Sequence, residues 1–447
     1  TLRRKDNPTM FYKATNPKTG NMWDVWLYYH AGTHYLYSLC TTKGAIGDWD
    51  NISVASSPDG VHWQEPGPAL TMHPGATWMG TGSTWGNPVA GGGGNPAFQI
   101  NYSIWAGPRQ TIFFATSDDL VHWSPSGPQK EFVQDERWYE RNGRWDCIWT
   151  IARPGGGLYG YWTASPKPET GGQFGFGESL DGLTWTALEP PKVSGVGVGE
   201  VGAIEKIGQK YYMLFGTNGR VETLVADRPQ GPFTALTRNK AVLSGHTYFA
   251  RFFNSPAGLL ACHHSIARDG RVFAGLLKGT AVDAEGTLRF TWWPGNEALK
   301  HKPVAVSPPA GGGKKPIRML PRKFDAAAGF VLEGKLQLPD PLGAPRGLYV
   351  EHGKGAGTAI LFRHDGSAEL GPVAADGAGF RPERTVDREM RFGPTANFRL
   401  VIQGPLLEAY LDDVLIECYS LPAGATGRIG LIPGGKGSSI GSLKAWK

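Results

Sequence analysis

The sequence predicts an all-β protein, a five-bladed β-propeller followed by a C-terminal β-sandwich. The first observation is a repeat, in which a Ser-rich strand end, a tight turn and a Trp recur with Trp63, Trp123 and Trp185 spaced 60 and 62 residues apart. Each copy is typical of a strand, an Asp-centred turn and a second strand. A repeat of this length fits a four-stranded blade with long loops, and roughly 300 residues would hold five of them.

Composition supports the same fold class. The chain of 447 residues contains 64 Gly, 34 Pro and 16 Trp, which favours short strands joined by turns over helix bundles. Its length suggests two domains. We expect the propeller over residues 1–299, a Pro-, Gly- and Lys-rich linker over 300–322 and the sandwich over 323–447, where Trp446 is the last Trp.

The same composition excludes several function classes. The net charge of +6 is spread along the chain without a basic stripe, so we expect no nucleic-acid partner. No run of about 18 apolar residues predicts a membrane span. The four Cys are scattered, so we expect neither a metal site nor a cofactor. The first residue is Thr1, which favours a processed chain in the periplasm or outside the cell. We expect a monomer or small homo-oligomer.

Three acidic residues stand in apolar or aromatic runs where a surface carboxylate is not expected. Asp24, Asp146 and Glu200 each begin a predicted strand. The inner strands of a propeller line one channel, so we expect these carboxylates at one mouth of it. Clustered carboxylates cleave glycosidic bonds. Glu200, with the longer side chain, is the predicted acid, Asp24 the nucleophile or base, and Asp146 a hydroxyl-binding group beside Arg144.

Other residues are candidates with a structural alternative. Flat aromatic faces stack on sugars, so Trp23, Trp78 and Trp85 are predicted to bind substrate with Ser83, although packing explains the last three equally well. His246, at the predicted fifth inner strand, would hold a channel cation or be a hydrogen-bonded core residue. We interpret four further carboxylates as turn or solvated residues: Asp59, Asp118, Asp181 and Glu205.

The order Asp24, then Arg144-Trp145-Asp146, then Glu200 resembles that of five-bladed propeller glycosidases acting on furanosides. The intervals are 122 and 54 residues. The resemblance is to glycoside hydrolase family 32, the invertase, inulinase and levanase group. It implies that Asp24 is the nucleophile, Asp146 the transition-state stabiliser and Glu200 the acid/base. The segment 319–322 resembles the junction to the sandwich of that family, so the resemblance spans nearly the whole chain.

The motifs depart from that family at each carboxylate. Trp23-Asp24-Val25 replaces an Asn-Asp-Pro-Asn-Gly motif, Trp145 separates the Arg and Asp of an Arg-Asp-Pro motif, and Val201 follows Glu200 where Glu-Cys-Pro is usual. Residues 200–212 are similar to the acid motif of family 43, which inverts configuration. We therefore expect a retaining hydrolase of the β-fructofuranosidase or fructan type acting on an oligo- or polysaccharide. The alternatives are an inverting arabinofuranosidase-like enzyme and a non-catalytic carbohydrate-binding propeller.

Overall fold

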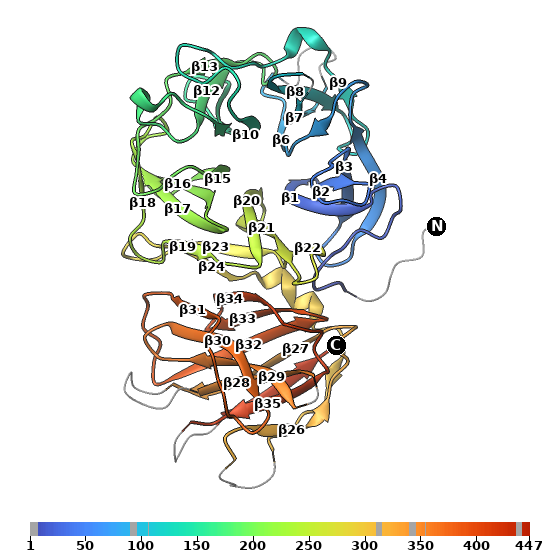
Figure 1. Ribbon diagram of the computed structural model, residues 1–447, viewed down its shortest axis with the longest axis vertical. Helices are drawn as coiled ribbons and strands as arrows, with labels where there is room; N and C mark the ends of the chain where they lie inside the picture. The colour runs from blue at the N-terminus through green and yellow to red at the C-terminus, as the bar shows by residue number, and fades with distance from the viewer. Residues whose placement is uncertain are drawn as a thin grey trace.

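A computed structural model describes residues 8–89, 96–105, 107–309, 315–338, 346–353, 355–434 and 440–447. Strands dominate these residues, and the helices among them are three short 3-10 segments, η1 (Pro128–Lys130), η2 (Pro168–Thr170) and η3 (Pro294–Leu299). Figure 1 shows a ring of sheets above a second, layered body of strands. The predicted all-β class, with a propeller and a sandwich, is confirmed.

Five sheets of the described residues surround a central channel, in agreement with the predicted number of blades (Figure 1). The first contains β1 (Asn21–His30), β2 (Thr33–Thr41), β3 (Asn51–Ser57) and β4 (Gln64–Thr71). The second contains β5 (Trp78–Met79), β6 (Ser83–Gly86), β7 (Phe98–Trp105), β8 (Gln110–Ser117) and β9 (Ser124–Pro125). The third contains β10 (Trp145–Ala152), β11 (Leu158–Ala164), β12 (Gly175–Ser179) and β13 (Thr186–Leu188).

The remaining two sheets complete the ring. The fourth contains β14 (Val193–Ser194), β15 (Glu200–Ile207), β16 (Lys210–Thr217), β17 (Arg220–Ala226), β18 (Phe233–Ala235) and β19 (Ala241–Leu243). The fifth contains β20 (Thr247–Ser255), β21 (Gly258–Ile266), β22 (Val272–Ala274), β23 (Lys278–Val282) and β24 (Leu288–Trp292). The innermost strands are β1, β10, β15 and β20, and in the second sheet β5 and β6, which both pair with β7.

The repeated turn is built by side chains that bind the backbone. The hydroxyl oxygen of Ser57 accepts a hydrogen bond from the backbone of Gly60 at 2.8 Å, and Oδ1 of Asp59 accepts two from the following residues. This local bonding explains the recurring Ser and Asp. In the second copy the turn carboxylate is Asp119, not Asp118 as the sequence interpretation had it, because Asp118 accepts a hydrogen bond from Ala97 instead.

The inner strands are irregular near one end. The pairing register shifts in β1 between Met22 and Val25, and in β10 between Asp146 and Trp149. It shifts again in β15 after Val201 and in β20 after Tyr248. In the second sheet the segment 80–82 separates β5 from β6. A β-bulge interrupts the alternation of side chains and can aim consecutive residues at one side of a sheet.

The C-terminal body is a β-sandwich that continues the fifth sheet. Thr291 of β24 pairs with Val414 of β34, so one sheet runs from the propeller into the sandwich. That sheet includes β25 (Pro303–Val304), β27 (Phe330–Gln337), β32 (Thr395–Gln403), β33 (Leu406–Leu411), β34 (Val414–Ser420) and β36 (Ile440–Trp446). The facing sheet contains β26 (Arg318–Lys323), β28 (Arg346–Gly353), β29 (Ala356–Phe362), β30 (Ser367–Ala374), β31 (Arg384–Asp387) and β35 (Arg428–Ile432).

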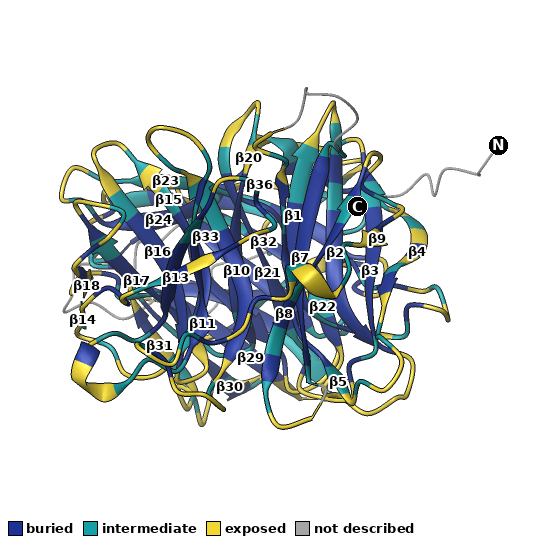
Figure 2. Ribbon diagram, turned by 90° about the horizontal axis from the view of Figure 1, so that it is seen from above, coloured by how far each residue is buried: buried dark blue, intermediate teal, exposed yellow. Residues whose placement is uncertain are grey.

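The segment between the two bodies, predicted as a linker, contributes strands to the sandwich. β25 pairs with β36, and β26 pairs with β35. The domain limits at 299 and 322 stay predictions. Figure 2 shows buried strands inside both bodies and exposed residues concentrated in the connecting loops. Among the described residues, no helix has the length and apolarity needed to cross a membrane.

Candidate active site

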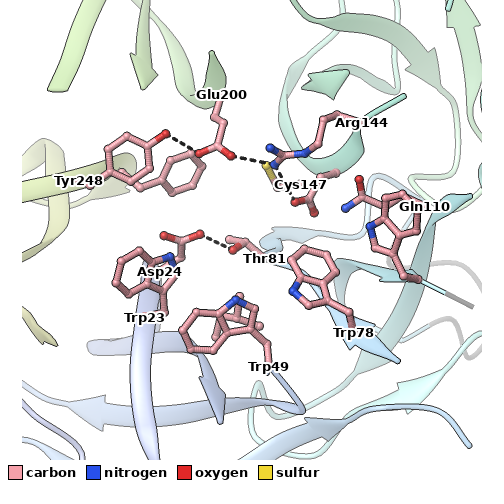
Figure 3. Close-up of a pocket in the computed structure, with 14 residues that line it drawn as sticks. Trp23, Asp24, Trp49, Trp78, Thr81, Gln110, Arg144, Cys147, Glu200 and Tyr248 are labelled. Atoms are coloured by element: carbon pink, nitrogen blue, oxygen red, sulfur yellow. Dashed lines mark hydrogen bonds and ion pairs between the residues drawn. The ribbon is translucent and has the colours of Figure 1, made fainter. Parts of the chain in front are cut away.

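The structure brings Asp24, Asp146 and Glu200 together in one cavity of about 420 Å³. They come from the inner strands of the first, third and fourth sheets, and Figure 3 shows the side chains of Asp24 and Glu200 facing one space with Arg144 and Tyr248. Fourteen residues line the cavity: Trp23, Asp24, Leu39, Trp49, Trp78, Thr81, Trp105, Gln110, Arg144, Asp146, Cys147, Glu200, Tyr248 and Phe249. The predicted convergence of distant strand starts is therefore present in the structure.

Asp24 is a buried carboxylate with one strong hydrogen bond. Thr81 donates its hydroxyl to Oδ2 at 2.5 Å, whereas the buried Oδ1 has no hydrogen-bond partner. Burial, and then the charge of Glu200, raise the pKa of Asp24 to about 7, while the Thr81 bond and Arg251 act in the opposite direction. A carboxyl group that titrates near neutrality can change protonation state during a reaction.

Asp146 is held by a different set of partners. Ser103 donates to Oδ1 at 2.5 Å, and Nη2 of Arg144 lies 3.4 Å from Oδ2. Burial raises the pKa of Asp146, and the nearby Arg144 charge lowers it. A glycine is required at position 80, because a Cβ atom there would lie 2.1 Å from the Ser103 hydroxyl and 2.7 Å from Oδ1 of Asp146.

Glu200 has partners on both carboxylate oxygens. Arg144 donates from Nη2 to Oε1 at 2.8 Å, and Tyr248 donates its hydroxyl to Oε2 at 2.5 Å (Figure 3). Burial and the Glu200 charge raise the pKa of Tyr248, so this phenol stays a donor. Arg144 thus bridges Asp146 and Glu200, which orients both carboxylates toward the cavity.

A buried arginine provides further positive charge at the site. Arg251 on β20 is fully buried and donates to the backbone oxygens of Gly202 at 2.5 Å and Gly82 at 3.3 Å. It therefore ties together backbone from three sheets. Its charge lowers the pKa values of both Asp24 and Asp146 and opposes the effect of their burial.

One wall of the cavity is aromatic. Trp23 and Trp78 line it as expected, together with Trp49 and Trp105. The rings of Trp23 and Trp49 stack with centroids 5.7 Å apart and planes inclined by 24°. Figure 3 shows Trp23, Trp49 and Trp78 on the side of the cavity away from Glu200 and Arg144. An aromatic face opposite polar groups is an arrangement that binds a sugar ring by its apolar face and its hydroxyls.

Two predicted substrate-binding residues do not line this cavity. The hydroxyl of Ser83 is buried and donates to the backbone oxygen of Ile148. The indole of Trp85 is buried, donates to Gln99 at 2.6 Å and packs with Trp185. Both side chains fill the space between neighbouring sheets, so the packing alternative describes them.

Several lining residues were missed by the sequence reasoning. Tyr248 stands near the start of the fifth inner strand, and the three acids stand near the starts of their inner strands. The sequence reasoning considered acids at such positions but did not consider a phenol that donates to a carboxylate. Thr81 and Gln110 carried no signal in the sequence, since neither stands in an unusual context. Cys147 and Phe249 have positive φ values of 48° and 57°, which mark bulges that the sequence does not predict.

His246 lies outside the cavity. Its Nδ1 accepts a hydrogen bond from the backbone of Ser420 at 3.3 Å, and its ring packs edge-on against Tyr419. These contacts match the expectation of a hydrogen-bonded His246, which was the alternative to a residue that holds a channel cation. Glu205, expected to be solvated, is half-buried, and burial raises its pKa to about 7. That expectation was wrong because the inner strand stays partly covered along this length.

Within the described residues, one group of side chains has the composition of a metal site. His263, Glu408 and Cys418 are buried where the fifth sheet meets the sandwich. Nζ of Lys278 lies 2.7 Å from Oε1 of Glu408 and already supplies the positive charge there. An ammonium group in this position repels a cation, so these residues do not fit a metal ion.

The fold and the cavity define a propeller–sandwich protein with a carboxylate-lined site. No protein-family model matches the chain, and no curated protein matches it by sequence. Solved structures do: fructofuranosidase from Schwanniomyces occidentalis with fructose is 14% identical, with 98% of this chain and 97% of that chain covered and a TM-score of 0.71. Exo-inulinase from Aspergillus awamori is 12% identical, with 99% and 98% covered and a TM-score of 0.73.

A plant structure has the same architecture. Fructan 1-exohydrolase IIa from Cichorium intybus is 13% identical, with 100% of this chain and 98% of that chain covered and a TM-score of 0.72. The similarity runs through both the propeller and the sandwich. These structures show that the chain has the fold of the fructofuranosidases.

Proposed function

We propose that this protein is a glycoside hydrolase that cleaves furanosidic bonds, of the β-fructofuranosidase or fructan type, with retention of configuration. The observation that carries the proposal is the meeting of Asp24, Asp146 and Glu200 in one cavity, with Arg144 bridging the last two. The fold similarity to enzymes described as fructofuranosidase, fructan exohydrolase and exo-inulinase supports an oligo- or polysaccharide containing fructose as the substrate.

The geometry suggests how the work is divided. Glu200, the most exposed of the three acids, gives its proton to the glycosidic oxygen as the bond to the anomeric carbon breaks. Asp24 attacks that carbon and forms a glycosyl ester. Glu200, now ionised, takes a proton from water, and the water oxygen attacks the anomeric carbon. The ester bond to Asp24 then breaks, which releases the sugar and restores the Asp24 carboxylate. Asp146, ionised beside Arg144, binds ring hydroxyls and stabilises positive charge that develops on the sugar.

The protonation of Asp24 depends on its surroundings. Burial, and then the Glu200 charge, raise the pKa of Asp24 to about 7. The productive form for retention has Asp24 ionised. Thr81 favours that form, because its hydrogen bond stabilises the ionised Asp24.

An inverting reaction on an arabinofuranoside is the second candidate, favoured by the family-43-like run that starts at Glu200. In that reaction Asp24 would activate water instead of attacking. The two candidates differ in the anomer released first, so NMR of the initial product distinguishes them. Release of the inverted anomer would contradict retention.

The test of the activity itself is hydrolysis of sucrose, inulin, levan and arabinofuranosides by the wild type and by Glu200→Gln. We expect release of fructose by the wild type and a loss of roughly 10²–10⁴-fold in the variant. The matched control is Glu205→Gln, a similar change of a half-buried Glu outside the cavity lining, which should retain activity. Binding of these sugars without cleavage by the wild type would favour the carbohydrate-binding alternative.

A further inference from the structure

The fifth sheet sends a pair of side chains to the two reacting carboxylates. Tyr248 on β20 and His264 on β21 are partners across the strand pair. Tyr248 donates a hydrogen bond to Glu200. The ring of His264 lies beside that of Tyr248, with centroids 6.1 Å apart, and its centroid is 4.9 Å from that of Trp23, next to Asp24 in the chain. One sheet therefore contacts both members of the proposed catalytic pair.

The contact between His264 and Asp24 is not a completed hydrogen bond. Nδ1 of His264 lies 3.5 Å from Oδ1 of Asp24. Both atoms are buried, and neither makes a hydrogen bond of normal geometry, although the backbone of Trp23 lies close enough to act on the His264 imidazole. The gap is too short to admit a bridging water and is longer than a direct N–H···O bond of roughly 2.7–3.2 Å. Buried polar atoms without partners are destabilising and uncommon, so two that face each other need an explanation.

Catalytic hydrogen bonds are often long in an empty site and shorten when substrate binds. We propose that His264 is a positioning residue for Asp24. When a saccharide fills the cavity, the Nδ1–H group of His264 donates a hydrogen bond to Oδ1 of Asp24. This inference rests on the proposed function. Thr81 already holds Oδ2, so a second donor on Oδ1 would set the rotation of the carboxylate.

The surroundings of the pair favour a neutral donor. Burial, and then His263, lower the pKa of His264 to about 3, so the imidazole is uncharged at working pH and carries one N–H. Five charged or titratable groups interact with Asp24: Glu200, Asp146, Arg251, Tyr248 and His264. A neutral imidazole adds a hydrogen bond without adding a charge, which stabilises ionised Asp24 modestly.

The first test compares His264→Asn with His264→Leu. The Asn amide can place a donor where Nδ1 stands, whereas Leu has none. We expect Leu to lower kcat with little change in KM and to move the acid limb of kcat, which reports the substrate complex, upward by roughly one pH unit, the size of one hydrogen bond to a charged group. Asn should restore most of both. Equal effects of the two substitutions, or an unmoved acid limb in the Leu variant, would overturn the proposal.

His34 is the matched control. It is buried, and both its ring nitrogens lack partners, but it is not a lining residue of the cavity. His34→Leu should leave the acid limb where it is. A shift as large as that of His264→Leu would mean that the limb reports general loosening of the fold.

A second measurement is independent of turnover and of the folding of the Leu variant. The 11 histidines of the wild type are labelled with ¹⁵N, and the His264 signals are assigned by their absence in His264→Asn. We expect the Nδ1 signal to move as Asp24 titrates and to lose this response in Asp24→Asn. A pH-independent signal in the wild type would refute the contact. The NMR result stands even if none of the furanosides is cleaved, so it separates this inference from the proposed function.

Discussion

Two buried carboxylates, Asp24 in the cavity and Glu408 where the propeller meets the sandwich, lie beside consecutive histidines of the same strand. Glu408 next to His263 is fully compensated: Lys278 lies 2.7 Å away, and Leu276 and Tyr410 also donate to it. Asp24 next to His264 has one donor and an unpartnered oxygen. Positive charge lowers the pKa of Glu408 to about 2, whereas burial raises that of Asp24 to about 7.

The different partners of these two carboxylates show that one fold uses buried charge in two ways. A carboxylate with a complete set of partners stays ionised and joins two domains. A carboxylate with an incomplete set of partners is destabilised as an ion and titrates nearer neutral pH, as carboxylates at functional sites often do. Substitutions at the two sites test whether the two carboxylates differ in this way.

The largest effect is expected from Asp24→Asn. Activity should fall by roughly 10²–10⁴-fold, because the reacting oxygen is lost. Stability should change in the opposite direction. The folded pKa near 7 exceeds the ordinary value of 3.8, so ionisation of Asp24 disfavours the fold increasingly as pH rises from about 4 to 7. The variant should thus unfold at a temperature higher by roughly 1–4 °C at pH 8 and show no gain near pH 4.

This result is read from thermal unfolding across pH, alongside kcat. The wild type measured in the same buffers is the reference. A variant that is less stable than the wild type at pH 8 would show that Asp24 is a structural charge like Glu408.

Lys278→Met addresses the other carboxylate. Removing the ammonium leaves a buried charge uncompensated, and we expect a loss of about 3–5 kcal/mol in the free energy of unfolding at pH 7. Activity per folded molecule should change little at low temperature, since Lys278 does not line the cavity. Denaturant unfolding and kcat of the same preparation measure both quantities.

The double variant Lys278→Met, Glu408→Gln is the control for this effect, because it removes both charges and should regain part of the stability. The wild-type pair contributes stability above pH 4.5 that is lost as pH falls toward 2. If the single variant keeps that acid dependence, the ion pair is not its origin.

Thr81→Val should have an intermediate effect. It removes the donor to Oδ2 of Asp24, so the pKa of this carboxyl rises further and the acid limb of kcat/KM moves up by roughly one pH unit. Ser103→Ala removes a hydroxyl at the same 2.5 Å distance from Asp146. It should lower kcat/KM without moving that limb, and equal shifts in the two variants would contradict the separate roles of the two acids.

The smallest effect is expected from the aromatic residues. Trp78→Ala should raise KM by roughly 5–10-fold, the loss of about 1 kcal/mol of stacking. Trp85→Phe removes an indole that packs between sheets and should lower the unfolding temperature while KM stays unchanged. Substrate saturation curves with thermal unfolding of both variants make the comparison. A higher KM for Trp85→Phe would restore it as a substrate-binding residue.

Much of the architecture could be predicted because its signals are local. The Ser and Asp of each repeated turn bind their own backbone, so they recur at the blade period and reveal the propeller. Three acids could be found from the sequence: Asp24, Asp146 and Glu200. Burying a carboxylate in an apolar run costs free energy, so an acid at such a strand start is unusual and points to a function. Ser83 and Trp85 could not be assigned, since a residue that packs between blades and one that lines the channel have the same alternating pattern.

The strands, their repeat and the three acids of the inner strands follow from local signals in the sequence. Which neighbours those acids meet depends on the tertiary structure. Thr81, His264 and Tyr248 reach Asp24 and Glu200 only after the ring of sheets closes, across separations of up to 240 residues. Bulges with positive φ at Cys147 and Phe249 shift the alternation at the channel mouth. Protonation follows from this closure, because burial and neighbouring charge, not residue type, raise the pKa of Asp24 while they hold Glu408 as an ion.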